Sequence, residues 1–542
     1  MATPSGRRLP LNPTLNIVTK PPTGRAPSRV LSTVLAWLLV AACTTDEPAT
    51  RSNEVVVALE NPPIHLDPRV ATDQSSARVF ELVLNGLVDK QPNGDLVPSL
   101  AESWQILDDG LVYRFQLRSG VRFHDGSGFS ADDVVWTFQS MLDGTVTTPK
   151  RGAFAQLESV SKVSDLVVDF NLREPYGAML VNLTTYVGII PAGATPEQMN
   201  RHPVGTGPFV FVSQSIDQIE VAANDDAWQG RPSLDRVILK QVPDATVREL
   251  ELRKGSTQLV VNGLAPDVVT ALGSEPRFKV VVDPGSNWSY LGLNMRQGPL
   301  SSPQVRRAML HAIDRQQIVD TLWQGLGIVG ESPIPAGHWA HHQQLPPVPY
   351  DPQAARDLLD AAGYPDGAGP EPRFTLTYKT STDQTVLLQA QVVQSMLAEV
   401  GIKIDIRSFE FATFYNDVKQ GNFEIFSLTQ TGIVDPDIFH LMLHSASAPP
   451  NGFNRGGYTN PNFDHQIELG AAAAGPATRR EHYLAAQEIF ARDLPLLSIF
   501  SKMNVGVMPR ELEGYENHLS GELYSLANAR WSDLPPLASL SE

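Results

Sequence analysis

The chain contains a single cysteine, Cys43, and this restricts how the fold can be stabilised. One cysteine excludes an internal disulfide framework and a zinc site built from cysteines. A chain of 542 residues must therefore be held together by apolar cores. Hydrophobic residues make up 42% of the sequence, which is enough for such cores and excludes a wholly disordered chain. At about 100–200 residues per domain, the length predicts two to four domains.

The segment before Cys43 has the organisation of an export signal. Basic residues and no acidic ones precede a short apolar run, Val30–Val40, and two alanines lead to the cysteine. The run is too short for a transmembrane helix, which needs about 20 residues. The stretch around the cysteine resembles the lipobox of bacterial lipoproteins, in which the cysteine is lipidated and becomes the first mature residue. We therefore predict a signal peptide over residues 1–42, lipidation of Cys43 and a polar tether over residues 43–53.

The charge balance is acidic, with 59 Asp and Glu against 42 Lys and Arg. Nucleic-acid binding requires clustered basic residues, so we expect no nucleic-acid partner. No repeat of 20–50 residues is visible, which argues against a solenoid or a propeller.

Hydrophobic periodicity changes along the chain. Alternating patterns in the first half predict strands at residues 54–59, 111–117, 167–172 and 236–242. After about residue 300, helical spacing predicts helices over residues 302–323, 351–363 and 387–400, and a strand follows at 402–406. Strands that alternate with helices indicate α/β lobes.

Motifs for catalysis are weak. Gly325–Gly330 spells GxGxxG, but its glycines end a predicted helix instead of joining a strand to a helix, as dinucleotide binding requires. Ser159–Lys162 spells SxxK between strand-like stretches, without the other elements of a serine acyl-enzyme. The GxSxG, HExxH and P-loop patterns do not occur. We therefore expect no enzymatic activity and no cofactor.

Three histidines, His338, His341 and His342, lie within five residues and are a candidate for metal binding. A segment rich in glutamine and proline follows them, which favours an irregular surface loop over a rigid metal site. We predict no metal site.

Short motifs recur in a fixed order along nearly the whole chain after the tether. They include Leu66–Pro68, Pro98–Trp104, Val121–Gly126, Phe129–Val134, Val204–Phe209, Ala312–Arg315 and Asp435–Asp437. In this order they resemble the peptide/nickel-type extracellular solute-binding proteins of family 5, the receptors of ABC importers. Gly205 and Gly207 in this set are expected to serve close backbone approaches, and His124–Gly126 a turn.

The resemblance implies a two-lobed periplasmic-binding-protein-like fold of type II, with a hinge between the lobes and an extra subdomain. Mapped onto this chain, one lobe comprises residues 54–93, 203–288 and 506–542. The extra subdomain comprises residues 94–202, and the second lobe comprises residues 289–505. Such a protein closes on its ligand by hinge bending.

The resemblance also implies a function. We predict an exported binding protein, lipid-anchored on the periplasmic or extracellular side of the membrane, that delivers a peptide or similar small solute to an ABC permease and works as a monomer. One alternative keeps the scaffold but makes it a scavenger or sensor of a metal chelate, a glycan or a cofactor. A more remote alternative is a secreted hydrolase.

The predicted ligand-binding residues come from three segments that the resemblance places around the cleft: Asn287, Trp288 and Tyr290; Tyr378, Lys379, Thr380 and Ser381; and Gly432 and Asp435. In peptide receptors of the family, an aspartate just before the Asp-Pro-Asp motif pairs with the α-ammonium group of the peptide. The corresponding segment 429–434 contains no acid. Either Asp435 has taken over this role or the ligand has no free amine. We expect an amine-lacking ligand or a longer peptide bound through its backbone, rather than a free dipeptide.

Overall fold

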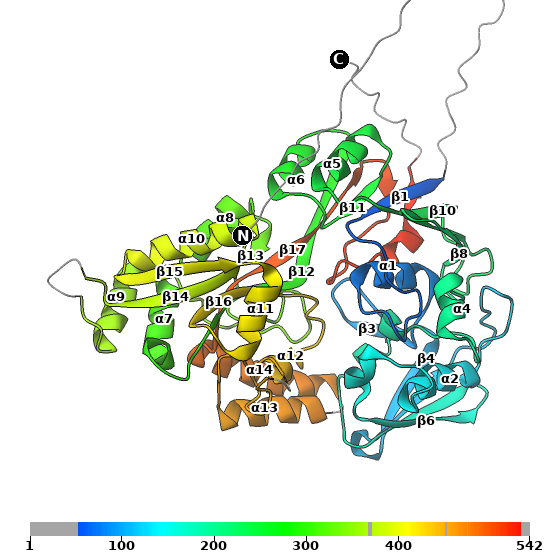
Figure 1. Cartoon of the computed structure of the whole chain (residues 1–542). Helices are drawn as coiled ribbons and strands as arrows, with labels where there is room; N and C mark the ends of the chain where they lie inside the picture. Colours follow the sequence, from blue (N-terminus) through cyan, green and yellow to red (C-terminus); the bar gives the residue numbers. More distant parts are fainter. Residues whose placement is uncertain (1–52, 367–370, 450–451, 474, 533–542) are drawn as a thin grey trace, which may run out of the picture. The chain divides into compact units, whose positions relative to one another are not determined.

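The computed structural model describes residues 53–366, 371–449, 452–473 and 475–532 (Figure 1). These described residues form one compact unit. Cys43, the predicted signal peptide and residues 43–52 of the predicted tether lie outside the described residues.

One large mixed sheet organises this unit, in the strand order β15-β14-β16-β12-β17-β11-β1-β10-β9-β8. Its two longest strands, β12 (Phe278–Leu293) and β17 (Leu496–Pro509), are antiparallel and pair along most of their length. Figure 1 shows them running side by side from the β11 and β1 strands to the β14–β16 strands.

The remaining strands of the sheet flank this central pair. On one side lie β8 (Phe209–Gln214), β9 (Gln218–Ala223), β10 (Arg236–Gln241), β1 (Glu54–Leu59) and β11 (Leu259–Val261). On the other lie β16 (Ile425–Gln430), β14 (Phe374–Ser381) and β15 (Ile402–Phe409), while β13 (Gly327–Ile328) pairs with β17.

A separate antiparallel sheet lies within residues 94–202. Its strand order is β4-β5-β7-β6, with bounds β4 (Ala101–Leu107), β5 (Val112–Leu117), β7 (Val167–Leu172) and β6 (Leu157–Ser164). Helix α2 (Ala131–Leu142) packs on β6 and β7, and its capping box at Ser130 and Asp133 begins it. The aromatic core between them, with Phe115, Phe138 and Phe170, is fully buried.

The remaining helices begin at side-chain caps or prolines, except the two that start at Met179 and Ile438. In the first half they are α1 (Gln74–Val83), α3 (Met179–Asn182), α4 (Pro196–Arg201), α5 (Ala245–Lys254) and α6 (Pro266–Gly273). In the second half they are α7 (Pro303–Ala312), α8 (Arg315–Leu322), α9 (Pro352–Ala361), α10 (Gln384–Ala398), α11 (Phe411–Gln420), α12 (Ile438–Leu443), α13 (Pro461–Ala472) and α14 (Pro476–Asp493). Short two-stranded sheets join β2 (Val88–Lys90) to β3 (Leu96–Pro98) and β18 (Leu512–Glu513) to β19 (Arg530–Trp531).

The predicted strands and the mixed α/β organisation are confirmed. The segment 302–323 differs, because two helices replace the single predicted one. The side chain of Asp314 accepts a hydrogen bond from the backbone N–H of Gln317 and starts α8 as a new helix. The apolar spacing continues across this break, so periodicity alone did not reveal it.

Two of the recurring motifs, Val121–Gly126 and Val204–Phe209, contact each other in the fold. The backbone N–H of His124 donates to the carbonyl of Gly205 (2.9 Å), and a His124 ring nitrogen lies 3.1 Å from the carbonyl of Gly207. Gly205 passes so close to the end of α1 that a Cβ there would lie 2.1 Å from the carbonyl oxygen of Val83. The expected close backbone approach at Gly205 is therefore confirmed.

Among the helices of the described residues, none combines the length and the apolar composition that a membrane crossing requires.

Candidate functional site

The large sheet contains two sets of parallel strands, β1 with β11 and β14 with β16. The carboxyl ends of the two sets face each other along the β12–β17 pair, and a gap separates them. β1 and β11 are parallel, and β11 ends at Val261 beside β17. β14 and β16 are also parallel, and β16 ends at Gln430, opposite Trp288 of β12, which pairs with Ser501 of β17. Residues 502–505 of β17 separate the two sets, so at about 3.3 Å per residue the strand ends lie about 16 Å apart. Open α/β sheets bind ligands outside the carboxyl ends of their parallel strands. This gap is the candidate solute site.

Asn287 and Gly432 meet at the edge of the gap. The register of β12 against β17 shifts just before Asn287. The backbone N–H of Gly432 donates to Oδ1 of Asn287 (3.1 Å). Gly432 has a φ of 66°, in the left-handed region that disfavours side chains, and a Cβ there would meet no atom within 4 Å. The turn after β16 therefore presents exposed backbone next to a side-chain amide.

The four predicted residues of β14 lie on different faces of that strand. Tyr378 and Thr380 are fully buried, and burial raises the pKa of the Tyr378 phenol. Lys379 points the other way and pairs with Asp417 of α11 at 2.6 Å. Ser381 is the last residue of the strand and is 8% exposed. Of the four, Ser381 lies at the strand end that borders the gap.

Trp288 and Tyr290 lie beneath the gap, in the core. Their rings stack with centroids 4.6 Å apart, and the side chains are 0% and 2% exposed. The indole N–H of Trp288 donates to Oγ of Ser498 (2.8 Å) on the neighbouring strand β17. This arrangement joins the two central strands below the site.

Asp435 already has an internal partner. The guanidinium of Arg479 on α14 binds both of its carboxylate oxygens, at 2.9 and 3.1 Å, and the two side chains are only 12% and 8% exposed. Asp437, two residues on, accepts hydrogen bonds from the hydroxyls of Tyr176 (3.4 Å) and Tyr483 (3.3 Å). Burial, together with the nearby charge of Asp435, raises the pKa of Asp437 to about 6.

Sequence reasoning missed three charged residues near the gap. Glu60 directly follows β1, Asp383 follows β14, and Lys502 lies in the middle of β17. Burial lowers the pKa of Lys502, and the charges of Asp383 and Glu60 partly oppose this effect. The signal that could have found the two acids is their position just past a strand end. No sequence signal distinguishes Lys502, because apolar and polar residues do not alternate regularly along β17.

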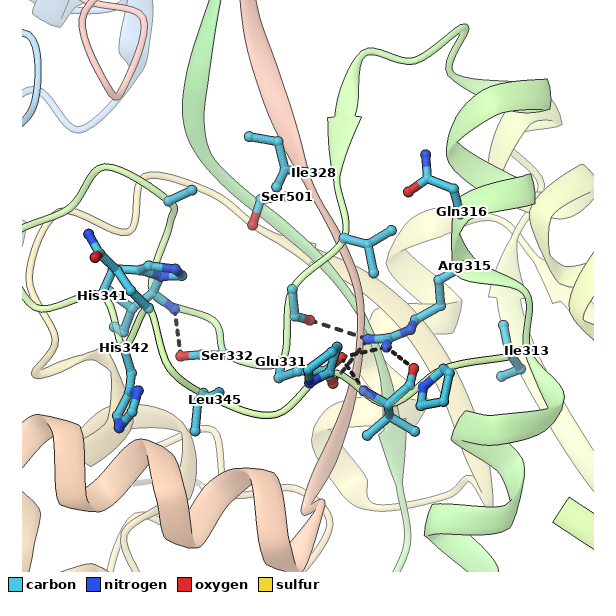
Figure 2. Close-up of a pocket in the computed structure, with 18 of the residues that line it drawn as sticks. Ile313, Arg315, Gln316, Ile328, Glu331, Ser332, His341, His342, Leu345 and Ser501 are labelled. Carbon is cyan, nitrogen blue, oxygen red and sulfur yellow. Dashed lines mark hydrogen bonds and ion pairs between the residues drawn. The ribbon is translucent and has the colours of Figure 1, made fainter. Parts of the chain in front are cut away.

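A cavity of about 340 Å³ lies between α8 and the loop 328–350 (Figure 2). Its wall includes Arg315, which binds Glu331 (2.6 Å) and donates to the carbonyl of Val348 (2.8 Å). The Arg315 and Glu331 side chains are 4% and 8% exposed. This ion pair ties the loop to the helix.

The clustered histidines do not converge on one point. A ring nitrogen of His338 lies 3.1 Å from the carbonyl of Val434, and one of His341 lies 2.8 Å from the carbonyl of Ile334. His342 approaches Glu488 at 3.3 Å. Within the described part of the chain, no group of three His, Cys, Asp or Glu side chains is arranged to hold a metal ion.

Residues 95–450 match the bacterial extracellular solute-binding proteins, family 5 Middle. The chain belongs to this family. It is 29% identical to heme-binding protein A of Haemophilus influenzae, over 90% of this chain and 96% of that protein. It is 31% identical to a probable di/tripeptide-binding protein of Pseudomonas aeruginosa, over 80% of this chain and 88% of that protein.

Solved structures agree in fold. HbpA2 from Haemophilus parasuis superimposes with a TM-score of 0.80 at 26% identity, over 88% of this chain and all of that one. The oligopeptide-binding protein AppA of Bacillus subtilis, solved with a nonapeptide, gives a TM-score of 0.70 at 26% identity, over 89% and 99% of the two chains. The predicted two-lobed binding-protein fold is confirmed. The chain is an extracellular solute-binding protein of this family, which consists of binding proteins rather than enzymes.

Proposed function

We propose that the protein captures its solute in the gap between the ends of β1 and β11 and the ends of β14 and β16, and that it closes by bending at residues 284–288 and 502–505. The two lobes then have the boundaries expected from the sequence. The observation that supports this most directly is the path of the sheet. Among the described strands, β12 and β17 alone connect its two sets of parallel strands, and the register shift before Asn287 lies where they do so.

The ligand we propose is a peptide or peptide-like solute held through its backbone rather than through an α-ammonium group. Asp435 is neutralised by Arg479, so its carboxylate is not available for a second cation. Gly432 brings exposed main chain to the site, and since Oδ1 of Asn287 already accepts the Gly432 N–H, the Asn287 side chain offers its amide N–H groups as donors. These groups match a peptide backbone better than a free amine.

Calorimetry with matched peptides tests this ligand class. We expect N-acetylation of di- to pentapeptides that bind the wild-type protein to change the dissociation constant by less than about threefold, which is under 1 kcal/mol. The same peptides with free amino groups serve as the reference. A loss of binding on acetylation would restore the ordinary recognition of an ammonium group and contradict the proposal.

The family and the N-terminal sequence support a proposal for the location and the partners of the protein. We propose that the chain is exported, cleaved before Cys43 and held at the membrane by lipid on that residue, where it serves an ABC permease as a monomer. One acyl chain gives only marginal membrane binding, so the anchor requires at least two chains.

Replacing Cys43 by serine tests the anchor. We expect Cys43→Ser to leave an uncleaved or mislocalised precursor, because the serine hydroxyl cannot replace the thiol that carries the lipid. Processing is read from the mass of the protein, and anchoring from detergent partitioning. Equal processing and equal partitioning of the variant and the wild type would contradict lipidation.

A further inference from the structure

A small cavity of about 160 Å³ lies beside Asn287 of β12 and residues 502–505 of β17, next to the candidate site. Its wall is formed by the turn after β11, the start of α6, the end of α8 and β17. Asn287 of β12, Trp323 and Lys502 all line this cavity. Asn287 also accepts the hydrogen bond from Gly432 at the edge of the gap. Asn287 therefore borders both the cavity and the region where we place the solute.

Lys502 is a cation without an anionic partner in this cavity. Its Nζ lies 4.2 Å from the centroid of the Trp323 ring, and it has no hydrogen bond or ion pair with any described residue. Lys379, the other lysine near the strand ends, has Asp417 as its partner at 2.6 Å. A cation that is shielded from water without such a partner is costly, and an aromatic face compensates only in part.

Trp323 adds a second unsatisfied donor. Its indole N–H is buried and has no acceptor among the described residues. A buried donor without an acceptor is destabilising, because it has lost its hydrogen bond to water. Both residues line one cavity, and each carries a donor that lacks an acceptor among the described residues. A ligand that brings an acceptor into the cavity would supply what is missing.

The neighbouring acids do not fill this role. Asp383 accepts the backbone N–H of Val386 (3.0 Å) and caps α10, while Glu60 lies 3.6 Å from Arg248. Both contribute to the field at Lys502, but neither comes within ion-pair distance of it. Each acid has its own partner, and Lys502 has none.

We propose that Lys502 and Trp323 form a subsite for an acidic group of the captured solute, a carboxylate or a phosphate. The inference rests on the proposed function and adds a charge requirement to it. The negative group of the solute lies beside Lys502 of β17, where the chain passes from one lobe to the other. The backbone of the solute contacts the ends of the parallel strands. Desolvation lowers the pKa of Lys502, and a bound anion would reverse that effect.

The test compares peptides with a free C-terminal carboxylate and the same peptides as C-terminal amides, by calorimetry. The proteins are the wild type, Lys502→Met and Lys254→Met, which removes the same charge from an exposed position at the end of α5. We expect amidation to weaken binding at least tenfold in the wild type and in Lys254→Met, and to have no effect in Lys502→Met. An equal effect of amidation in all three proteins would overturn the subsite.

A second measurement separates this inference from the proposed function. If no peptide of either form binds, the peptide proposal fails, and the subsite is tested alone by thermal melting in millimolar inorganic phosphate. We expect phosphate to raise the melting temperature of the wild type and of Lys254→Met more than that of Lys502→Met. Equal shifts in the three proteins would show that Lys502 does not hold an anion.

Discussion

Replacing Arg479 by methionine is expected to lower the free energy of unfolding by about 3–5 kcal/mol, because it leaves the buried carboxylate of Asp435 without its counter-charge. The guanidinium binds both oxygens of Asp435 and also donates to the carbonyl of Gly470 (3.2 Å). Chemical denaturation monitored by tryptophan fluorescence measures the loss.

Two further variants identify the cause of that loss. Asp435→Asn combined with Arg479→Met should recover most of the stability, because the unpaired charge is then gone. Arg530→Met removes an ion pair with Glu513 whose side chains are 61% and 44% exposed. It should cost less than about 1 kcal/mol. A loss below 1 kcal/mol for Arg479→Met would show that Asp435 is not held by this pair and is free to bind a ligand.

Gly205→Ala is expected to destabilise the protein by about 3 kcal/mol or more, at the upper end of overpacking effects. The new methyl group would lie 2.1 Å from the carbonyl oxygen of Val83 and 3.0 Å from the Cα of Leu84. These are backbone atoms at the end of α1 and cannot rotate away. Thermal melting of the purified variant measures the effect.

Gly152→Ala is the matched control, because a Cβ at Gly152 meets no atom within 4 Å. Its φ is not positive, so alanine is tolerated there. The melting temperature of Gly152→Ala should stay close to that of the wild type. Equal stability of Gly205→Ala and Gly152→Ala would contradict the close packing of the Gly205 segment on α1.

The periodicity of the sequence predicted the fold elements well where one face of a strand or helix is buried. The helix at residues 351–363 is an example, because Asp351 caps it and apolar residues face one side. The break at Asp314 was missed, because a capping side chain can start a new helix within a continuous apolar pattern. The gap between the ends of β11 and β16, beside residues 502–505, depends on the pairing of distant strands, which local patterns do not contain.

The predicted site residues differ in exposure and in their partners, and the difference has a physical reason. Gly432 follows β16 and is exposed, and Asn287 lies half-buried at the register shift of β12. Ser381 ends β14 and is only 8% exposed. Trp288, Tyr290 and Tyr378 lie inside strands, and large rings on a buried face join the core. Whether Lys379 and Asp435 are free depends on Asp417 and Arg479, which are distant in sequence. The roles of all the predicted site residues as ligand contacts stay predictions.

The most direct test of solute capture in the gap is calorimetry on a variant that fills it. Gly432→Tyr places a large side chain in the open space beside Asn287, while Gly255→Tyr places the same side chain at another left-handed position, at the end of α5. Both substitutions carry a similar backbone strain of about 1–2 kcal/mol. With the peptide that binds the wild type most tightly, we expect Gly432→Tyr to lose binding by at least tenfold and Gly255→Tyr to bind like the wild type. Unchanged binding by folded Gly432→Tyr would contradict the location of the site.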